Sequence, residues 1–296
     1  MSGLENPIEV YKLAIMTFLE NFKPTHLKLT VESPTFWRVT FNNPPINVIG
    51  TEMMRDMKEL LAELENNDTV NVVVFDSADP DFYIAHYDVE IDGEASEALP
   101  GTTGYTSWVD ITVRISKLNA VTIAAIRGIT RGAGSELVLA MDMRFASLEK
   151  AKLAQVEIAL SAVTGGGASG RLPSLVGRGR TMEILLGAED FDGALAEKYG
   201  YVNRAIPDAE FEDFVTNFAR RVSGWDHQAI VEVKDFVNKY TRLPDAEYPL
   251  HSDAYWVGVS RPGVGDRVSR LIEAGMQKRS PLEYNLAGDI AAIAQQ

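Results

Sequence analysis

The sequence predicts an α/β protein built on a parallel sheet, from the pattern of two apolar segments and the helix between them. VNVVVFDS and AVTIAAIRG fill consecutive positions with apolar residues, which is typical of strands buried on both faces. A helix is expected over residues 109–118, between these two strands. Because a strand–helix–strand order at this spacing requires a crossover connection, the strands are expected to be parallel and covered by helices.

The elements before this unit can be assigned from their periodicity. An amphipathic helix is expected over about residues 1–25, where it would cap the domain or lie at a subunit contact. LKLTVES and TFWRVTF, split by Ser33 and Pro34, alternate as the two strands of a hairpin do. A helix over 52–64 follows, because its apolar residues recur on one face.

The segments after the unit predict a second round of the same pattern and then a largely helical end. A helix is expected over 132–141, a strand at MRFAS and a helix from Ser169. Further helices are expected near 193–200, 209–223, 226–240, 247–259 and 265–277. We therefore predict one α/β core over 26–205 rather than two independent domains, followed by a helical C-terminal segment over 206–296 that serves oligomerisation.

Composition excludes several classes of function. The 296 residues include 28 Lys and Arg against 42 Asp and Glu, a formal net charge of −14 that argues against binding nucleic acid or anionic membranes. The absence of cysteine excludes disulfides, a thiol nucleophile and thiolate zinc sites, and the four histidines are too scattered to suggest a metal site. No apolar run reaches the ~18–20 residues of a membrane-spanning helix. The acidic N-terminal segment lacks the basic region of a signal peptide, so a cytoplasmic protein is expected.

A glycine-containing turn, RGAGSELVLAMD, directly follows the second apolar strand and opens a helix. Small residues allow a sharp turn, and the free N–H groups of the first helical turn point at whatever lies before it. Ala133 and Gly134 are therefore candidate donors to an oxyanion. The alternative is that the glycines only allow the helix to pack tightly on a strand.

Two glutamates are candidate acid–base groups. Glu136 lies in the first turn of that helix, where the helix dipole favours an anionic carboxylate; alone, it is best explained as a capping residue. Glu157, in AQVEIALS, would alone be taken for a surface residue. Two carboxylates in one partly dry pocket would have their pKa values pushed apart, so that one acts as base and the other as acid.

Two further features have both a functional and a structural interpretation. Gly165, Gly166 and Gly167 could present backbone groups to a water or a ligand, or could form only a flexible connection. His86, in FYIAHYD, is either a catalytic base or a core histidine. A single histidine between aromatic residues favours the second interpretation.

Taken together, these segments resemble the enoyl-CoA hydratase/isomerase (crotonase) superfamily over about residues 27–240. The resemblance rests on five segments that occur in the family's order: FNNPPINVIG, FYIAHYD, AVTIAAIRGITRGAGSELVLAMDMRFAS, VEIALSAVTGGGASGRLPSLVG and LLGAEDFDGALAEKYGYVNRAIP. It implies a crotonase-like spiral of ββα units, assembled as a homotrimer or a homohexamer.

The resemblance also implies a reaction and its residues. The backbone N–H groups of His86 and Ala133 would form an oxyanion hole for a thioester carbonyl, with Gly134 nearby to position the substrate. Glu136 and Glu157 would hold a water and exchange protons with the substrate carbons, and the backbone of Gly165 would help to position that water. The implied activity is that of a lyase, enoyl-CoA hydratase, with coenzyme A as part of the substrate and no covalently bound cofactor.

Two alternatives remain. NPPINVI and YDVEIDGE contain no Lys or Arg, although the family often uses basic residues in these regions to contact the CoA phosphates. The chain could therefore be a CoA-independent C–C bond hydrolase that cleaves a β-diketone, with the side chain of His86 and the two glutamates acting on water. Another enolate chemistry, such as isomerisation or decarboxylation, belongs to the same alternative. The second alternative is a non-catalytic binding or assembly protein.

Overall fold

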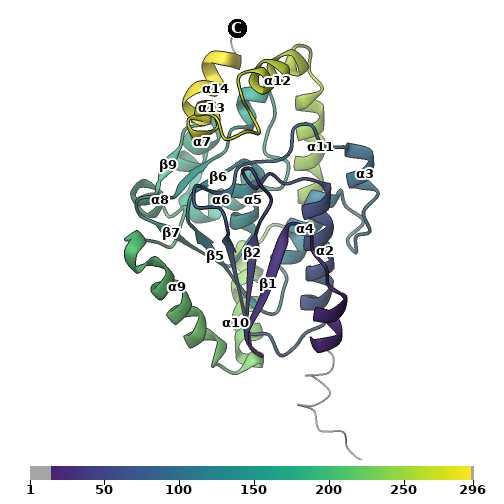
Figure 1. Ribbon diagram of the computed structural model, residues 1–296, viewed down its shortest axis with the longest axis vertical. Helices are drawn as coiled ribbons and strands as arrows, with labels where there is room; N and C mark the ends of the chain where they lie inside the picture. Colours follow the sequence, from purple (N-terminus) through teal and green to yellow (C-terminus); the bar gives the residue numbers. More distant parts are fainter. Residues whose placement is uncertain (1–14, 295–296) are drawn as a thin grey trace, which may run out of the picture.

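The computed structural model describes residues 15–294, which form two β-sheets with helices packed around them (Figure 1). The larger sheet has the strand order β1-β2-β3-β5-β7-β10, and the smaller has the order β4-β6-β8-β9. Strands β1 and β2 form the predicted antiparallel hairpin, and every other neighbouring pair in the larger sheet is parallel. The parallel α/β core predicted from the apolar segments is thus confirmed.

The strands are short, and those of the smaller sheet have only two or three residues. Those of the larger sheet are β1 (Leu27–Ser33), β2 (Phe36–Phe41), β3 (Val72–Ser77), β5 (Val121–Ile126), β7 (Met143–Ser147) and β10 (Arg204–Ile206). Those of the smaller sheet are β4 (Phe82–Ile84), β6 (Ile129–Arg131), β8 (Lys152–Ala154) and β9 (Phe191–Asp192).

Most of the longer helices of the core and of the C-terminal segment lie close to the predicted positions, whereas α3, η1, α7, α13 and α14 were not predicted. In the core they are α2 (Thr51–Glu65), α3 (Gly93–Glu97), α4 (Ser107–Ile115), α5 (Ala133–Ala140), the 3₁₀ turn η1 (Glu157–Leu160), α6 (Ala168–Val176), α7 (Arg178–Gly187) and α8 (Gly193–Tyr199). Beyond it are α9 (Asp208–Ser223), α10 (His227–Thr241), η2 (Asp245–Glu247), α11 (Tyr248–Val259), α12 (Val264–Glu273), α13 (Pro281–Tyr284) and α14 (Leu286–Ala294).

The chain repeats one unit three times, which produces the spiral. In each turn a strand of the larger sheet is followed by a strand of the smaller one and then by helices: β3 and β4 with α3 and α4, β5 and β6 with α5, and β7 and β8 with η1 and α6. Successive turns therefore stack, and the chain leaves the smaller sheet at corresponding points. The ends of β4, β6 and β8 thus lie side by side, and the segments that follow them can share one site.

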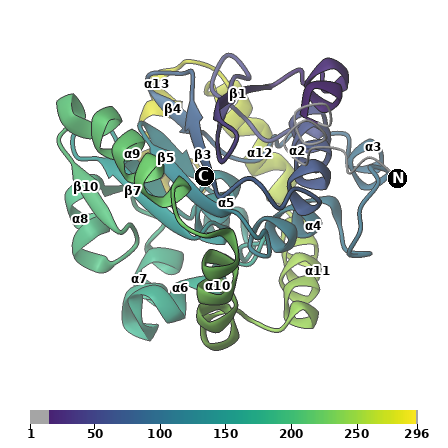
Figure 2. The same ribbon diagram turned by 90° about the horizontal axis from the view of Figure 1, so that it is seen from below.

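The two faces of the larger sheet bury separate cores. Alternate residues of the strands, such as Val73 and Phe75, pack against α2, α4 and α5 on one face. Their neighbours Val72 and Val74 pack against α9 and the start of α10 on the other (Figure 2). Burial on both faces explains why these strands are continuously apolar in sequence.

The ends of the chain pack on this core. Residues 15–21 are helical, and Phe18 in this helix stacks on Trp37 of β2 at 6.1 Å, so the described part of the predicted N-terminal helix caps the sheet. Residues 1–14 of that predicted helix lie outside the described residues. Helices α12, α13 and α14 gather at one end of the molecule, at the top of Figure 1.

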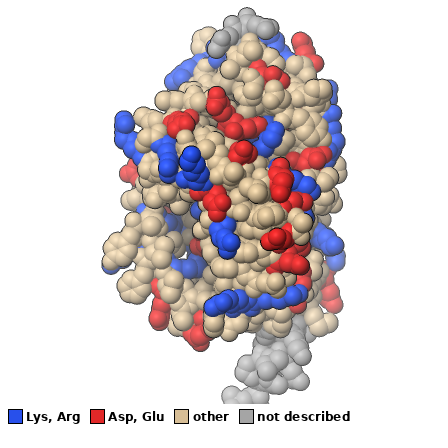
Figure 3. All heavy atoms as spheres, turned by 90° about the vertical axis from the view of Figure 1, so that its left-hand side faces the viewer, with Lys and Arg blue, Asp and Glu red and all other residues tan. Residues whose placement is uncertain are grey.

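On the face shown in Figure 3, acidic and basic side chains are interspersed rather than separated by sign. None of the helices in the described part of the chain has both the length and the apolar character needed to cross a bilayer.

Candidate active site

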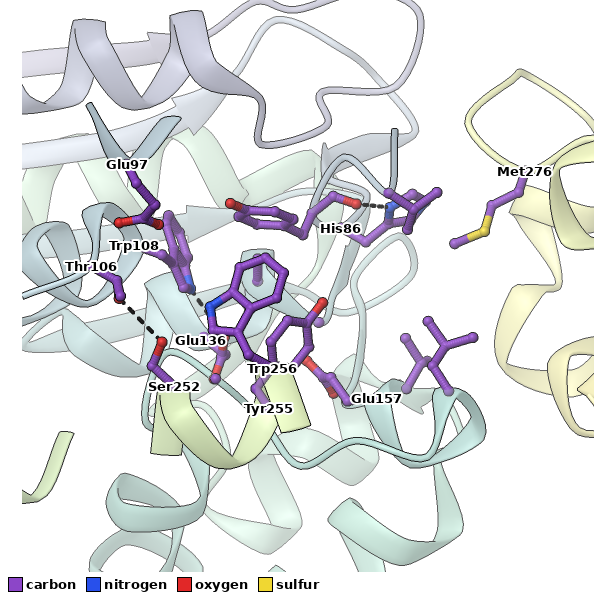
Figure 4. Close-up of a pocket in the computed structure, with 17 residues that line it drawn as sticks. His86, Glu97, Thr106, Trp108, Glu136, Glu157, Ser252, Tyr255, Trp256 and Met276 are labelled. Atoms are coloured by element: carbon purple, nitrogen blue, oxygen red, sulfur yellow. Dashed lines mark hydrogen bonds between the residues drawn. The ribbon is translucent and has the colours of Figure 1, made fainter. Parts of the chain in front are cut away.

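A pocket opens where the ends of the smaller sheet meet helices α4, α5 and α11 (Figure 4). Most of its lining is aromatic or aliphatic, and the polar groups at its wall include both candidate glutamates. The apolar lining includes Tyr87, Trp108, Val156, Leu160, Tyr255 and Trp256. Few convergent polar groups in a mostly apolar pocket are typical of a small-molecule site.

The turn between β6 and α5 directs Glu136 into this pocket. Gly132 adopts a φ of 50°, a left-handed conformation that favours glycine, and helix α5 begins at the next residue, Ala133. Ala133 lines the pocket, and its backbone N–H has no hydrogen-bond acceptor among the described residues. This free N–H belongs to the first turn of a helix, as the sequence predicts.

The Glu136 carboxylate is buried and accepts three hydrogen bonds. Trp108 Nε1 donates to its Oε2 at 3.1 Å, and the backbone N–H groups of Gly166 and Ala168 donate to its Oε1 at 2.7 and 3.4 Å. Burial raises the pKa of Glu136 above its ordinary value, although these three donors act in the opposite direction. Loss of solvent around the carboxylate therefore outweighs the helix N-terminus, which was expected to favour the anion.

Glu157 is also buried, so the interpretation as a surface residue is wrong. It begins η1, 8% exposed, and no cation contacts its carboxylate within residues 15–294. The Gln155 amide nitrogen, in the orientation that satisfies that side chain, lies 3.1 Å from both Glu157 oxygens. Burial, followed by the negative charge of Glu136, raises the pKa of Glu157 to about 8. The predicted separation of roles thus has a physical basis, because the charge of Glu136 raises the pKa of Glu157 further, whereas three donors and the charge of Arg171 favour the anion of Glu136.

The His86 side chain is fully occupied by structural contacts. Its Nδ1 lies 2.7 Å from the carbonyl oxygen of Tyr87, and its Nε2 lies 2.8 Å from Oε1 of Glu283 on α13. Neither ring nitrogen is left to take a proton from a substrate or a water. The geometry therefore favours a core histidine and argues against the imidazole as the catalytic base.

The backbone hydrogen bonds around His86 bear on the first predicted oxyanion-hole donor. The C=O of His86 accepts from the N–H of Ile49 at 2.9 Å, and in a trans peptide the next N–H points in the opposite direction. The N–H of Tyr87 therefore points away from Ile49. The N–H groups of His86 and Tyr87 both have no acceptor among the described residues. A Cβ on Gly132 would lie 3.7 Å from the Cβ of His86, so the turn that carries Ala133 packs directly against His86. The predicted donor pair, the N–H groups of His86 and Ala133, stays a prediction.

The other two predicted glycines have different surroundings. A Cβ on Gly134 would lie 2.5 Å from the carbonyl oxygen of Ile84, so this glycine allows α5 to pack tightly on β4, the structural alternative raised by the sequence. Gly134 is not part of the pocket wall. Gly165 does line the pocket, against the ring of Tyr255.

Helix α11 contributes residues that sequence reasoning missed. Figure 4 shows Tyr255 between the two glutamates, with Ser252 hydrogen-bonded to Thr106 at 3.2 Å. Met276, after α12, lines the pocket on the side of His86. The adjacent aromatic residues Tyr255 and Trp256 in the helix predicted over 247–259 were the available signal. Part of the C-terminal segment therefore completes the pocket of its own chain.

The site can be compared with those of known proteins. The sequence profile of the enoyl-CoA hydratase/isomerase family matches residues 32–254. A crystal structure presented as a "putative enoyl-CoA hydratase" from Streptomyces avermitilis superposes with a TM-score of 0.87 at 40% identity, covering 90% of this chain and 97% of that one.

Two curated relatives are more distant in sequence. The chain is 24% identical to short-chain-enoyl-CoA hydratase of Clostridium acetobutylicum over 237 residues, which are 79% of this chain and 90% of that protein. It is also 24% identical to a peroxisomal Δ(3,5)-Δ(2,4)-dienoyl-CoA isomerase of Arabidopsis thaliana over 275 residues, 89% of this chain and 98% of that protein.

Proposed function

The chain belongs to the enoyl-CoA hydratase/isomerase (crotonase) family, and on this premise we propose that it adds water to the double bond of an enoyl-CoA thioester. The observation that carries the proposal is the pair of buried glutamates at one pocket, of which one is rich in hydrogen-bond donors and the other has no cation in contact. Such a pair provides a base and an acid at the same pH.

The oxyanion hole would be formed by the N–H groups of His86 and Ala133. A thioester carbonyl placed between them becomes a better electron acceptor, because both donors stabilise the negative charge that develops on its oxygen. Both N–H groups lack other acceptors in the described chain, so no existing bond has to break when the substrate binds. The backbone of Gly165, in the pocket wall, would help to position the attacking water.

Proton transfers follow from the two carboxyl groups. Glu136, as the anion, takes a proton from water while the oxygen of that water forms a bond to Cβ. The electrons of the Cα–Cβ π bond move into an enolate held by the oxyanion hole, and Glu157, as the neutral acid, gives its proton to Cα. The product is a 3-hydroxyacyl-CoA, and transfer of a proton from Glu136 to Glu157 restores the starting state.

The lining of the pocket is compatible with the acyl group and the thioester of such a substrate. It contains four aromatic side chains and no Lys or Arg. The phosphates of coenzyme A would therefore lie outside this pocket, and coenzyme A would take part only as the carrier of the acyl group.

We also propose that the chain assembles as a homotrimer or a dimer of trimers through the outer face of α10. Four large apolar side chains of this helix are 54–78% exposed: Val233, Phe236, Val237 and Tyr240. A contiguous apolar face of this kind marks a protein–protein contact. Sedimentation of the wild type beside Phe236→Glu tests this, because a charge in the contact should yield monomers.

Calorimetric titration separates the proposed reaction from its alternatives. We expect heat on addition of a saturated short-chain acyl-CoA, and hydration of the corresponding enoyl-CoA with loss of the conjugated thioester absorbance. A cyclic β-diketone should give neither heat nor ring-opened acid. Ring opening without acyl-CoA binding would favour the C–C bond hydrolase, and the absence of turnover with either substrate class would favour the binding or assembly protein.

A further inference from the structure

His86 lies buried between two hydrogen-bond acceptors. Its Nδ1 faces the carbonyl oxygen of Tyr87 and its Nε2 faces the Glu283 carboxylate, and the residue is only 3% exposed. A carbonyl oxygen and an ionised carboxylate only accept, so with Glu283 ionised both ring nitrogens carry a hydrogen when both bonds form. The geometry is therefore satisfied by an imidazolium cation paired with a carboxylate anion.

Glu283 is held rigidly in turn. Its Oε1 also accepts from the backbone N–H of Gln277 at 2.6 Å, and its carbonyl oxygen accepts from Arg131 Nη1 at 2.6 Å. The residue is completely buried. Burial alone would lower the pKa of His86 and raise that of Glu283, but their mutual attraction outweighs it and shifts each pKa in the direction that favours the charged pair.

Residues 276–283, which we call the C-terminal clasp, contact the segment after β4 at a second point. The side-chain oxygen of Gln277 accepts from the backbone N–H of Val89 at 2.8 Å. The clasp also places Met276 in the pocket wall, on the side of His86 (Figure 4). It thus holds the chain at His86, whose free N–H is the proposed oxyanion-hole donor, and again at Val89.

We propose that the His86–Glu283 pair is a positioning device for the oxyanion hole, through which the C-terminal clasp holds the N–H of His86 in place. This inference rests on the proposed function. The imidazolium donates to the carbonyl of Tyr87 while the preceding carbonyl, that of His86, accepts from Ile49. His86 is therefore held at its backbone carbonyl and at both ring nitrogens, and a neutral imidazole that faces a carboxylate could keep only one of the two ring bonds.

The charged groups around His86 come from several elements. Glu283 approaches from α13 and Arg131 from β6, and Arg131 is itself paired with Asp190 at 2.7 Å. A Cβ on Gly132 would lie 3.3 Å from Oε1 of Glu157, from η1, and 3.7 Å from the Cβ of His86. Among these groups only Glu283 contacts the imidazole, so its charge can be removed without touching the catalytic glutamates.

Glu283→Gln is the variant that tests the inference, with Glu90→Gln as the matched control. Glu90 is exposed and contacts the clasp only through the Gln277 side chain at 3.3 Å. We expect Glu283→Gln to lower kcat for enoyl-CoA hydration about 10- to 100-fold with KM nearly unchanged, because a displaced oxyanion-hole donor affects mainly the transition state. Glu90→Gln should behave as the wild type. Near-UV circular dichroism checks that each variant is folded.

Two further measurements separate positioning from general stabilisation. The double variant Glu283→Gln with His86→Gln should lose no more kcat than the more damaging single variant, because both substitutions break the same His86–Glu283 pair. Hydrogen exchange of the amides of residues 86–89, read without substrate, should be faster in Glu283→Gln. NMR of the His86 ring should show that it loses its proton at a lower pH in that variant.

The outcomes are distinct from those that test the hydratase itself. A wild type without acyl-CoA turnover overturns the proposed function, whereas the exchange and NMR measurements still test the pair. Additive effects of the two substitutions, or unchanged kcat and unchanged amide exchange in Glu283→Gln, would overturn the positioning role.

Discussion

Asp110 and Glu157 are both buried carboxylates, yet their surroundings are opposite. Asp110, on α4, is completely buried and contacts Lys58 Nζ and Arg114 Nη1, each at 3.2 Å. Its other oxygen accepts from the backbone and hydroxyl of Thr103. Burial alone would raise its pKa, but the Thr103 bonds and Lys58 outweigh it and hold the pKa below the ordinary value. Glu157 is also buried, but no cation contacts it within the described residues, and its pKa rises to about 8.

The comparison shows what distinguishes a structural carboxylate from a reactive one in this chain. Loss of solvent affects both groups in the same direction, so the difference comes from their partners. A fold selected only for stability would supply Glu157 with a cation, as it does Asp110. A carboxyl group kept neutral near physiological pH, beside a second carboxylate, is instead typical of acid–base catalysis.

The largest expected effect is on turnover. Glu136→Gln and Glu157→Gln should each lower kcat for hydration by roughly 10²- to 10⁴-fold, because each removes a group that transfers a proton in the transition state. Asp110→Asn should change kcat by no more than about threefold when measured on folded protein. Steady-state kinetics on the three variants checks this. A glutamine variant that retains a tenth of wild-type kcat would contradict the assigned role.

Substitutions at Asp110 and at Glu157 should change the free energy of unfolding in opposite directions. Asp110→Asn leaves Lys58 and Arg114 short of a counter-charge and should lower the free energy of unfolding by about 2–4 kcal/mol. Glu157→Gln should raise it by about 1–3 kcal/mol at pH 8, because the neutral amide avoids burying a charge.

The gain from Glu157→Gln should depend on pH in a defined direction. The pKa of Glu157 in the folded chain is about 8, against an ordinary value of 4.5. Between these values the unfolded chain releases a proton that the folded chain keeps, so the wild type loses stability as the pH rises. Urea unfolding at pH 5 and pH 8 should show a larger gain at pH 8. Equal gains at both values would argue against a raised pKa at this site.

The wild-type rate should follow a bell-shaped pH profile set by the same pair. Glu157 must be protonated to act as acid, so kcat/KM should fall about tenfold per pH unit above about pH 8. Glu136 must be ionised, and its raised pKa places the acidic limb above the ordinary glutamate value. A rate that is constant across pH 6–10 would exclude Glu157 as the proton donor.

Local sequence patterns predicted the strands of the larger sheet better than those of the smaller sheet. The apolar run 72–75 is long enough to identify β3, whereas β8 and β9 have three and two residues and exist through pairing with distant segments. Strands this short contain too few residues to show alternation. The smaller sheet was therefore not predicted, although its strand ends carry the site.

At the site, sequence reasoning identified the residues but not their partners. Glu136 and Glu157 were predicted together, while the burial of Glu157 depends on packing by segments more than a hundred positions away, such as α14. The ion pair of His86 joins positions 197 residues apart, and no local pattern identifies Glu283 as its partner. The helix that carries Tyr255 was predicted, but which surface it covers is decided by tertiary packing.

The smallest expected effect tests the hydrogen bonds that distinguish Glu136 from Glu157. Trp108→Phe keeps an aromatic ring in the pocket wall and removes the Nε1 donor to Glu136 Oε2, while the N–H groups of Gly166 and Ala168 remain. The anion of Glu136 becomes less favourable, so the acidic limb should move up by less than about 1 pH unit and kcat should fall about two- to tenfold.

Trp37→Phe is the matched control for this change. The Nε1 of Trp37 is buried and has no hydrogen-bond partner among the described residues, so the same chemical deletion removes no bond. Its pH profile should coincide with that of the wild type. If both substitutions moved the acidic limb equally, the shift would reflect a general loosening of the core. If only Trp108→Phe moves it, the indole N–H is one of the donors that keep Glu136 the base and leave Glu157 the acid.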